Sequence, residues 1–222
     1  MSGSARWPVR LALGPVLLRP WRLLDQQSWD EIRRRNAPWT GPWDSTRPPE
    51  SIEPSLTFAG MVRQANRRAR QGTMLPFAVD YLAPGRKRPV LAGQLTISGI
   101  THGSASWAQA GYWVDQRWAG RGIIPTALAL AADHCFFDLR LHRLEVAIRP
   151  ENIRSLRVVE KLGFRNEGLR PRYMHVDGDW RDHLVFVLHS EEIGDGLVAR
   201  LPDPALSSDT PDTIPGGAVR AD

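Results

Sequence analysis

Cysteine is almost absent from this sequence. Cys135 is the only one among 222 residues, which excludes a disulfide framework and a thiolate metal site. Cys135 falls in helical register with Ile124, Leu128 and Ala131, so we expect it to be a small apolar core residue rather than a nucleophile. No two histidines have the close spacing of zinc ligands, so no metal is expected. The histidines are His102, His134, His142, His175, His183 and His189.

Long apolar runs are missing as well. Near the N-terminus, Arg10, Pro15 and Arg19 interrupt the apolar residues, which excludes a signal-peptide core. No later segment is long enough to span a bilayer. We therefore expect a soluble cytoplasmic protein without a membrane partner.

Lysine is the third scarce residue. Lys87 and Lys161 are the only two, so 27 of the 29 basic residues are arginines. The net charge of +5 is unevenly distributed, because residues 201–222 carry four aspartates against one arginine. The basic body suits an anionic cofactor or an RNA-rich neighbourhood such as the ribosome, and it equally suits a solvated arginine surface. No DNA partner is expected.

Turn residues and hydrophobic periodicity predict a loose arm over residues 1–14, one domain over residues 15–200 and a disordered acidic tail over residues 201–222. The order of elements in the domain predicts an α+β fold, with a mixed, mostly antiparallel sheet of about six to seven strands and helices on both faces. The expected strands cover residues 15–20, 74–81, 90–98, 107–115, 141–149, 164–176 and 183–189, and the expected helices cover 23–35, 53–71, 125–137 and 152–162.

Residues 36–53 contain the pairs Pro38-Trp39, Pro42-Trp43 and Pro48-Pro49. Proline removes a backbone donor and restricts the residue before it, so we expect a loop without a regular element. Long ordered loops are often functional. Trp39 and Trp43 are therefore candidates for the wall of a substrate groove, with packing in the core or in a lid as the alternative.

A glycine turn, Gly120-Arg-Gly122, separates the strand expected over residues 107–115 from the apolar helix expected over residues 125–137. Such a turn leaves several backbone N–H groups free to bind an anion. Pro125 takes the third glycine position of a dinucleotide fingerprint, and no Gly-Lys-Ser/Thr follows. Both the dinucleotide fingerprint and the P-loop are thereby excluded. The turn predicts a phosphate site of another kind.

Several short motifs accompany this turn in a fixed order between about residue 15 and residue 190. They are Leu18-Arg-Pro20, Gly111-Tyr-Trp113, Asn152-Ile-Arg-Ser155, Glu160-Lys-Leu-Gly-Phe164, Glu167-Gly168 and Asp177-Gly-Asp-Trp-Arg-Asp182. Together they resemble the GNAT superfamily of N-acetyltransferases, and within it the RimJ/RimL branch, whose members acetylate the N-termini of ribosomal proteins. The resemblance implies the GNAT fold, acetyl-CoA as cosubstrate and a ribosomal-protein N-terminus or another amine as acceptor. It leaves an association with the ribosome open.

The resemblance also implies a set of cofactor-binding residues. Val114 lies beside the pantetheine, with its N–H as a candidate to polarise the thioester carbonyl, and Asn152 and Ser155 lie near CoA. Arg117-Trp-Ala-Gly120-Arg-Gly122 fits the signature letters of the family. The phosphate-binding amides must, however, lie at the helix start, which favours a register two residues later. In that register the pyrophosphate lies on Ala119, Gly120, Arg121, Gly122, Ile123 and Ile124.

The chain departs from the family pattern in four places. Ala119 replaces a polar residue and Ile124 replaces glycine or alanine, the latter change being shared by the RimJ/RimL branch; backbone amides tolerate both. Gln109 stands where many relatives carry a glutamate base. Val159 stands where others carry a tyrosine acid.

Ser155 remains as the candidate catalytic group, to protonate or hydrogen-bond the leaving thiolate, and water as the only base. The alternative for Ser155 is a place in the first helical turn beside the N-cap Asn152. The resemblance further makes Gln109 a candidate substrate residue. Tyr173 is, like Trp39 and Trp43, a candidate for the wall of a substrate groove, with core or lid packing as the alternative. Asp182 and Glu145 are candidates for binding the amine, with a solvated carboxylate at a strand end or on the surface as the alternative.

Three functions fit these residues. The first is acetyl transfer from acetyl-CoA to a protein N-terminal α-amine in a ternary complex, which needs little base because an α-amine has a pKa of about 7.7–8.0. The second keeps the cosubstrate and changes the acceptor to a small amine, such as an antibiotic or a polyamine. The third is a non-catalytic acyl-CoA-binding or ribosome-binding module, which the missing base and acid would suit.

Overall fold

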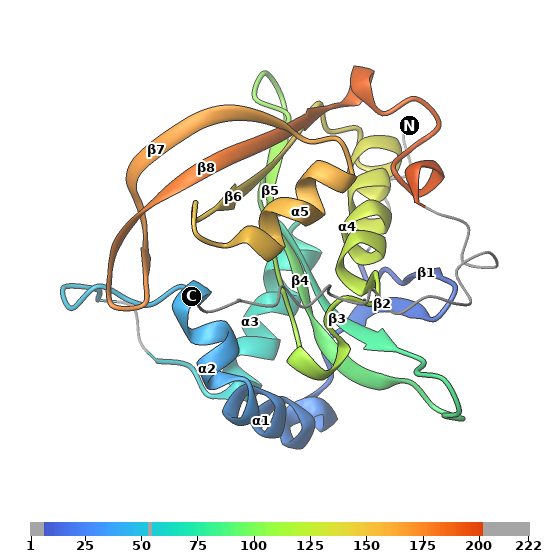
Figure 1. Ribbon diagram of the computed structural model, residues 1–222, viewed down its shortest axis with the longest axis vertical. Coiled ribbons are helices and arrows are strands. Elements are labelled where there is room, and N and C mark those ends of the chain that lie inside the picture. The colour runs from blue at the N-terminus through green and yellow to red at the C-terminus, as the bar shows by residue number, and fades with distance from the viewer. Residues whose placement is uncertain (1–6, 53–54, 202–222) are drawn as a thin grey trace, which may run out of the picture.

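Eight strands form one sheet in the order β1-β2-β3-β4-β5-β6-β8-β7 in the computed structural model, which describes residues 7–52 and 55–201 (Figure 1). All neighbouring strands are antiparallel except β5 and β6, which are parallel. The mixed, mostly antiparallel α+β architecture is confirmed, with one strand more than predicted. The strands are β1 Leu11–Leu13, β2 Val16–Pro20, β3 Met74–Tyr81, β4 Val90–Thr101, β5 Trp107–Val114, β6 Arg143–Ile148, β7 Arg165–Val176 and β8 Asp179–His189.

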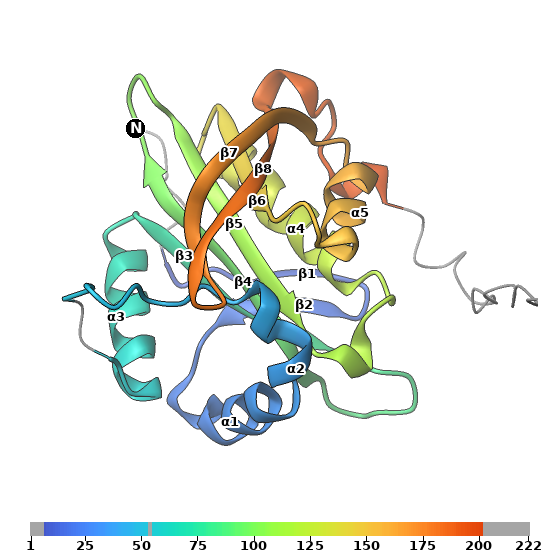
Figure 2. The same ribbon diagram turned by 60° about the vertical axis from the view of Figure 1, so that its left-hand side comes forward.

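Helices cover both faces of the sheet (Figures 1 and 2). The α-helices are α1 Gln26–Arg35, α2 Ala37–Thr40, α3 Phe58–Arg70, α4 Ile123–Asp133 and α5 Ile153–Lys161. Successive side chains of a strand point to opposite faces, and β3 serves both: Phe77 and Val79 pack in the larger core with α4 and α5. Ala78, between them, packs with α1 and α3. Cys135 is buried in the larger core, as predicted.

The N-terminal segment differs from the prediction of a loose arm. β1 pairs with β2 from Leu11↔Leu18 to Leu13↔Val16 and forms the edge of the sheet. Before it, Trp7 is buried against Phe77 and donates a hydrogen bond of 2.9 Å from Nε1 to Asn66. An aromatic side chain thus anchors the segment before β1 to the core. Residues 1–6 and most of the predicted acidic tail lie outside the described residues.

Two short helices occupy the segment predicted to lack a regular element. α2 is followed by the 3-10 turn η2 Gly41–Trp43, and a proline lies in the first turn of each. Proline is tolerated there because the first N–H groups of a helix have no intrahelical partner. The helix predicted from residue 53 begins at Phe58, with the Thr57 hydroxyl accepting the Gly60 N–H at 3.2 Å.

The β7–β8 hairpin is longer than predicted, because β8 starts at Asp179 instead of residue 183. Asp177 and Gly178 have φ angles of +51° and +78°, as in the two-residue turns that match the twist of paired strands. Pairing therefore resumes directly at Val176↔Asp179. No helix in the described residues is long and apolar enough to cross a membrane.

A buried charge cluster fixes β2 within the sheet. Arg19 is 5% exposed; it donates hydrogen bonds to Asp80 on β3 at 2.6 and 3.0 Å and to Asp25 at 2.7 and 2.9 Å. Burial opposes the charge of Arg19, but these carboxylates outweigh it and raise its pKa. The Leu18-Arg-Pro20 motif thus has a structural basis in this fold.

Candidate active site

A cleft opens where β5 and β6 separate. The two strands pair only from Trp107↔Arg143 to Gln109↔Glu145, although β5 continues to Val114 and β6 to Ile148. The resulting cleft has a volume of about 750 Å³ and is lined by β4, β5, β6, the start of α4 and α5. Diverging parallel strands leave backbone hydrogen-bonding groups available to a ligand. The cleft is large enough for an extended cosubstrate together with an acceptor group.

The glycine turn forms one end of this cleft. Gly120 and Gly122 line it and have φ angles of +78° and +71°, a conformation that only glycine adopts readily. Gly122 is the N-cap of α4, and in the described residues no side chain caps this helix end. Pro125, in the first turn, has no N–H to satisfy. The remaining N–H groups at the start of α4 are therefore suited to a phosphate.

The two isoleucines after the turn are almost completely buried. Ile123 and Ile124 are 2% and 6% exposed, and α4 begins at Ile123, two residues before the predicted helix start. A branched side chain at residue 124 thus packs into the core. Arg121 is not among the residues that line the cleft; its guanidinium lies 5.6 Å from the ring centroid of Trp118.

Val114 presents its backbone to the cleft. The Asp115 N–H donates to the Ala92 carbonyl on β4 at 2.7 Å, and successive N–H groups of a strand point to alternate sides. The Val114 N–H therefore points away from β4. The Val114 carbonyl accepts a hydrogen bond of 3.1 Å from Trp39 Nε1.

Ser155 faces Tyr112 across the cleft. Asn152 is the N-cap of α5 and accepts the Ser155 N–H at 3.2 Å, while the Ser155 hydroxyl donates to the Tyr112 phenol oxygen at 3.3 Å. Burial raises the pKa of Tyr112, so the phenol keeps its proton at neutral pH. Sequence reasoning missed this partner, although Tyr112 lies in the Gly111-Tyr-Trp113 motif.

Residues 37–44, here called the strap, form part of the wall of the cleft. Trp39 and Trp43 both line the cleft. The Arg154 guanidinium lies 4.4 Å from the Trp39 ring centroid, and that of Arg149 lies 5.4 Å from Trp43. Arg149 also donates to the Pro42 carbonyl at 2.8 Å. The strap thus links β5 to α5 and to the end of β6.

A buried carboxylate joins the residues just before the strap to the residues just before the glycine turn. Asp115 is fully buried and accepts hydrogen bonds from Arg35 at 2.8 Å, Asn36 at 3.1 Å and Arg117 at 2.8 Å. Burial opposes its ionisation, but the hydrogen bonds, led by Arg117, outweigh burial and lower the pKa of Asp115. Asn36 in turn accepts the Gln116 N–H at 2.8 Å.

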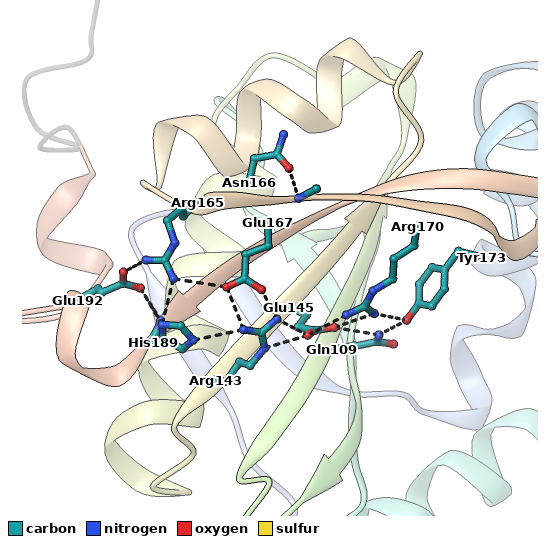
Figure 3. A network of polar contacts seen from close by, with 11 residues as sticks. Gln109, Arg143, Glu145, Arg165, Asn166, Glu167, Arg170, Tyr173, His189 and Glu192 are labelled. Atoms are coloured by element: carbon teal, nitrogen blue, oxygen red, sulfur yellow. Dashed lines mark hydrogen bonds and ion pairs between the residues drawn. The ribbon is translucent and has the colours of Figure 1, made fainter.

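Gln109 marks the point where β5 and β6 part (Figure 3). Its amide donates to the Tyr173 hydroxyl at 2.7 Å and to Glu145 at 3.4 Å. Glu145 is buried and pairs with Arg143 at 2.6 Å and with Arg170 at 3.3 Å. These pairs satisfy the Glu145 carboxylate away from the cleft lining, so its geometry does not suit the predicted contact with an amine.

Most residues predicted from the sequence meet at this cleft. Those that line it are Trp39, Trp43, Gln109, Val114, Ala119, Gly120, Gly122, Ile123, Ile124, Asn152 and Ser155. Tyr173 does not line the cleft, but its hydroxyl accepts a hydrogen bond from Gln109, which does. Asp182 does not: it is exposed and accepts the Arg172 N–H at 2.8 Å, which ties its carboxylate to the hairpin backbone. In the described residues, no cluster of three or more candidate ligands could hold a metal ion.

Comparison with known proteins agrees with this geometry. The model of the acetyltransferase (GNAT) domain matches residues 16–165. The chain belongs to the GNAT family of acetyltransferases. It is therefore an N-acetyltransferase that takes acetyl-CoA as cosubstrate, and the glycine cradle at the start of α4 fits the phosphates of that molecule.

Three individual proteins are similar to this chain. A solved structure of Mycobacterium smegmatis RimJ in complex with CoA-disulfide is 36% identical, with a TM-score of 0.77, over 87% of this chain and 93% of that one. The [ribosomal protein uS5]-alanine N-acetyltransferase of Escherichia coli is 29% identical over 170 residues, which are 76% of this chain and 81% of that protein. The probable N-acetyltransferase YjcK of Bacillus subtilis is 37% identical over 98 residues, 54% of its own length.

Proposed function

We propose that this enzyme transfers the acetyl group of acetyl-CoA to the N-terminal α-amine of a protein, with a ribosomal protein that begins with alanine or serine as the acceptor. The observation that carries the proposal is the extended similarity to the uS5-alanine N-acetyltransferase of E. coli. An α-amine, with a pKa of about 7.7–8.0, is partly neutral near pH 7 and needs less activation than a lysine.

The charge of the cleft favours this acceptor over a polyamine. Among the described residues that line the cleft, Asp44 is the only acid, and it is paired with Arg33 at 2.5 Å. The cleft also holds several arginines, which repel a polycation. A peptide N-terminus carries a single charge, which it loses before attack.

In this proposal, each of the residues predicted to contact acetyl-CoA has a role in binding it or in the transfer. The N–H groups of residues 120–124 hold the pyrophosphate, and the Val114 N–H polarises the thioester carbonyl. Asn152 fixes the start of α5 beside the cosubstrate. The Ser155 and Tyr112 hydroxyls protonate the leaving thiolate.

An acceptor panel tests the proposal. We expect purified enzyme to release CoA from acetyl-CoA with peptides that begin with alanine or serine, and far more slowly with spermidine or with N-terminally blocked, lysine-containing peptides. Mass spectrometry should locate the acetyl group on the α-nitrogen. Preferential acetylation of the small amines would contradict the proposed acceptor, and acetyl-CoA binding without turnover on any amine would favour the non-catalytic alternative.

Substitution of Ser155 tests the leaving-group step. We expect Ser155→Ala to lower kcat about tenfold, equivalent to about 1.4 kcal/mol, because Tyr112 still offers one hydroxyl. Ser155→Ala with Tyr112→Phe removes both donors and should cost about 100-fold. The affinity for acetyl-CoA should change little, as calorimetry can check. Ser190→Ala, whose hydroxyl bonds Glu191 outside the cleft, is the control, and an unchanged kcat in the double variant would refute the role.

A further inference from the structure

His183 is a buried imidazole that the site described above leaves unused. It lies on β8, is 4% exposed and nevertheless lines the cleft. Its Nδ1 lies 3.0 Å from the Arg181 carbonyl oxygen. A carbonyl can only accept, so Nδ1 must carry the hydrogen. In the neutral ring the lone pair is then on Nε2, for which the described residues provide no hydrogen bond.

The surroundings of His183 place it in the part of the cleft where β5 and β6 separate. Tyr173 on β7 meets the imidazole edge-on, with ring centroids 6.0 Å apart, and accepts the Gln109 amide at 2.7 Å where β5 and β6 part. On the β6 side, Leu184, the next residue, pairs with Ile148, another lining residue. His183 therefore lies in the cleft between Tyr173 and the end of β6.

Burial, more than the surrounding charges, keeps His183 neutral. Burial lowers its pKa, and Arg149 at the end of β6 acts in the same direction. The Arg181 carbonyl, Asp182 on the same strand and Glu151 after β6 oppose this without reversing it. The imidazole is therefore uncharged at neutral pH, as a proton acceptor must be.

Among the titratable side chains in the described cleft lining, His183 is the one with an unpaired acceptor atom. Its arginines and its lysine have no acceptor atom when charged, and burial raises the pKa of Tyr112. Asp44 accepts two hydrogen bonds from Arg33, at 3.2 and 2.5 Å. Glu145 is held by Arg143 and Arg170 and does not line the cleft.

We propose that His183 Nε2 is the general base of this acetyltransferase and takes the proton that the acceptor amine loses. The amine nitrogen attacks the acetyl carbon; a nitrogen–carbon bond forms and the carbon–sulfur bond breaks. The attacking nitrogen becomes cationic and strongly acidic, so a weak base suffices. The thiolate takes one proton from the hydrogen-bonded pair of Ser155 and Tyr112 hydroxyls. His183 then returns the proton of the amine to this pair through solvent. Amine and acetyl-CoA thus give amide and CoA thiol, with no other reactant.

Variants of His183 test this role in the full-length enzyme. His183→Asn can still donate to the Arg181 carbonyl but has no basic nitrogen, and we expect kcat to fall about 100-fold with unchanged acetyl-CoA affinity. His183→Ala should behave alike and regain activity with added imidazole. His142→Asn is the control, because His142 is an exposed imidazole outside the cleft. The acceptor is whichever amine the wild type acetylates fastest.

A measurement without an acceptor separates this inference from the choice of substrate. Nitrogen-15 NMR of the histidine rings should show His183 as the Nδ1–H tautomer at neutral pH, with a pKa below the ordinary value of about 6.5. A protonated Nε2 at neutral pH would overturn the proposal, as would full kcat in His183→Asn. Loss of folding or of acetyl-CoA binding in both variants, without rescue by imidazole, would make His183 a structural residue. If the wild type acetylates no amine, the proposed acceptor fails, and NMR still decides the state of His183.

Discussion

The Gly122→Glu variant should lose nearly all affinity for acetyl-CoA. A Cβ placed on Gly122 meets no atom within 4 Å, so the new side chain extends into the open space in front of the helix start. There its carboxylate faces the proposed position of the pyrophosphate. Two like charges about 4 Å apart in a protein environment repel by about 4 kcal/mol, which corresponds to about a thousandfold weaker binding. Isothermal calorimetry with acetyl-CoA and with CoA measures this directly.

A matched glycine separates repulsion from backbone strain. Gly103, in the turn between β4 and β5, has a φ of +77°, and a Cβ there also meets nothing within 4 Å. Gly103→Glu therefore imposes similar strain, about 1–2 kcal/mol, away from the cleft, and should leave acetyl-CoA affinity unchanged. Equal losses in the two variants, or wild-type affinity in Gly122→Glu, would rule out the cradle as the phosphate site.

Among the substitutions considered, Arg19→Met should lower the free energy of unfolding the most. The substitution leaves the carboxylates of Asp25 and Asp80, whose side chains are 11% and 9% exposed, facing each other without a cation. Removing one partner of a buried ionic cluster costs about 3–5 kcal/mol of the free energy of unfolding. For a chain of this size, that lowers Tm by roughly 6–20 °C. Urea denaturation and calorimetry measure both quantities.

Neutralising the whole cluster distinguishes charge from packing. If uncompensated carboxylates cause the loss, Asp25→Asn and Asp80→Asn added to Arg19→Met should recover part of it, because no buried charge then remains. The exposed Arg10 offers a control, since Arg10→Met removes an arginine from the same end of the chain without touching the cluster. A triple variant less stable than Arg19→Met alone would show that packing dominates.

The local part of the site could be predicted from sequence. The turn Gly120-Arg-Gly122 and the N-cap Asn152 each depend on a few consecutive residues, and the backbone conformations that they need are encoded there. Trp39 and Trp43 were also predictable as cleft candidates, although not the short helices that carry them. Proline in a first helical turn and proline in a loop have the same sequence pattern.

Tyr112 and His183, which sequence reasoning missed, belong to the site only through contacts between elements far apart in the sequence. Tyr112 meets Ser155 only because β5 and α5 lie side by side across a gap of more than forty residues in sequence. Nothing in the sequence distinguishes His183 from the other histidines. It lines the cleft only because β5 and β6 separate in the folded protein. Asp182, one residue earlier, points to the opposite face of the same strand.

The carboxylate of Asp115 has a consequence for the order of events. It is hydrogen-bonded to Arg35 and Asn36, where the strap begins, and to Arg117, just before the glycine turn. One buried carboxylate therefore connects the residues just before the strap with the residues just before the phosphate cradle. If this connection couples the two regions, the coupling is reciprocal: the acceptor raises the affinity for acetyl-CoA by the same factor by which acetyl-CoA raises the affinity for the acceptor. We therefore expect the proposed transfer to favour a complex that holds both substrates at once.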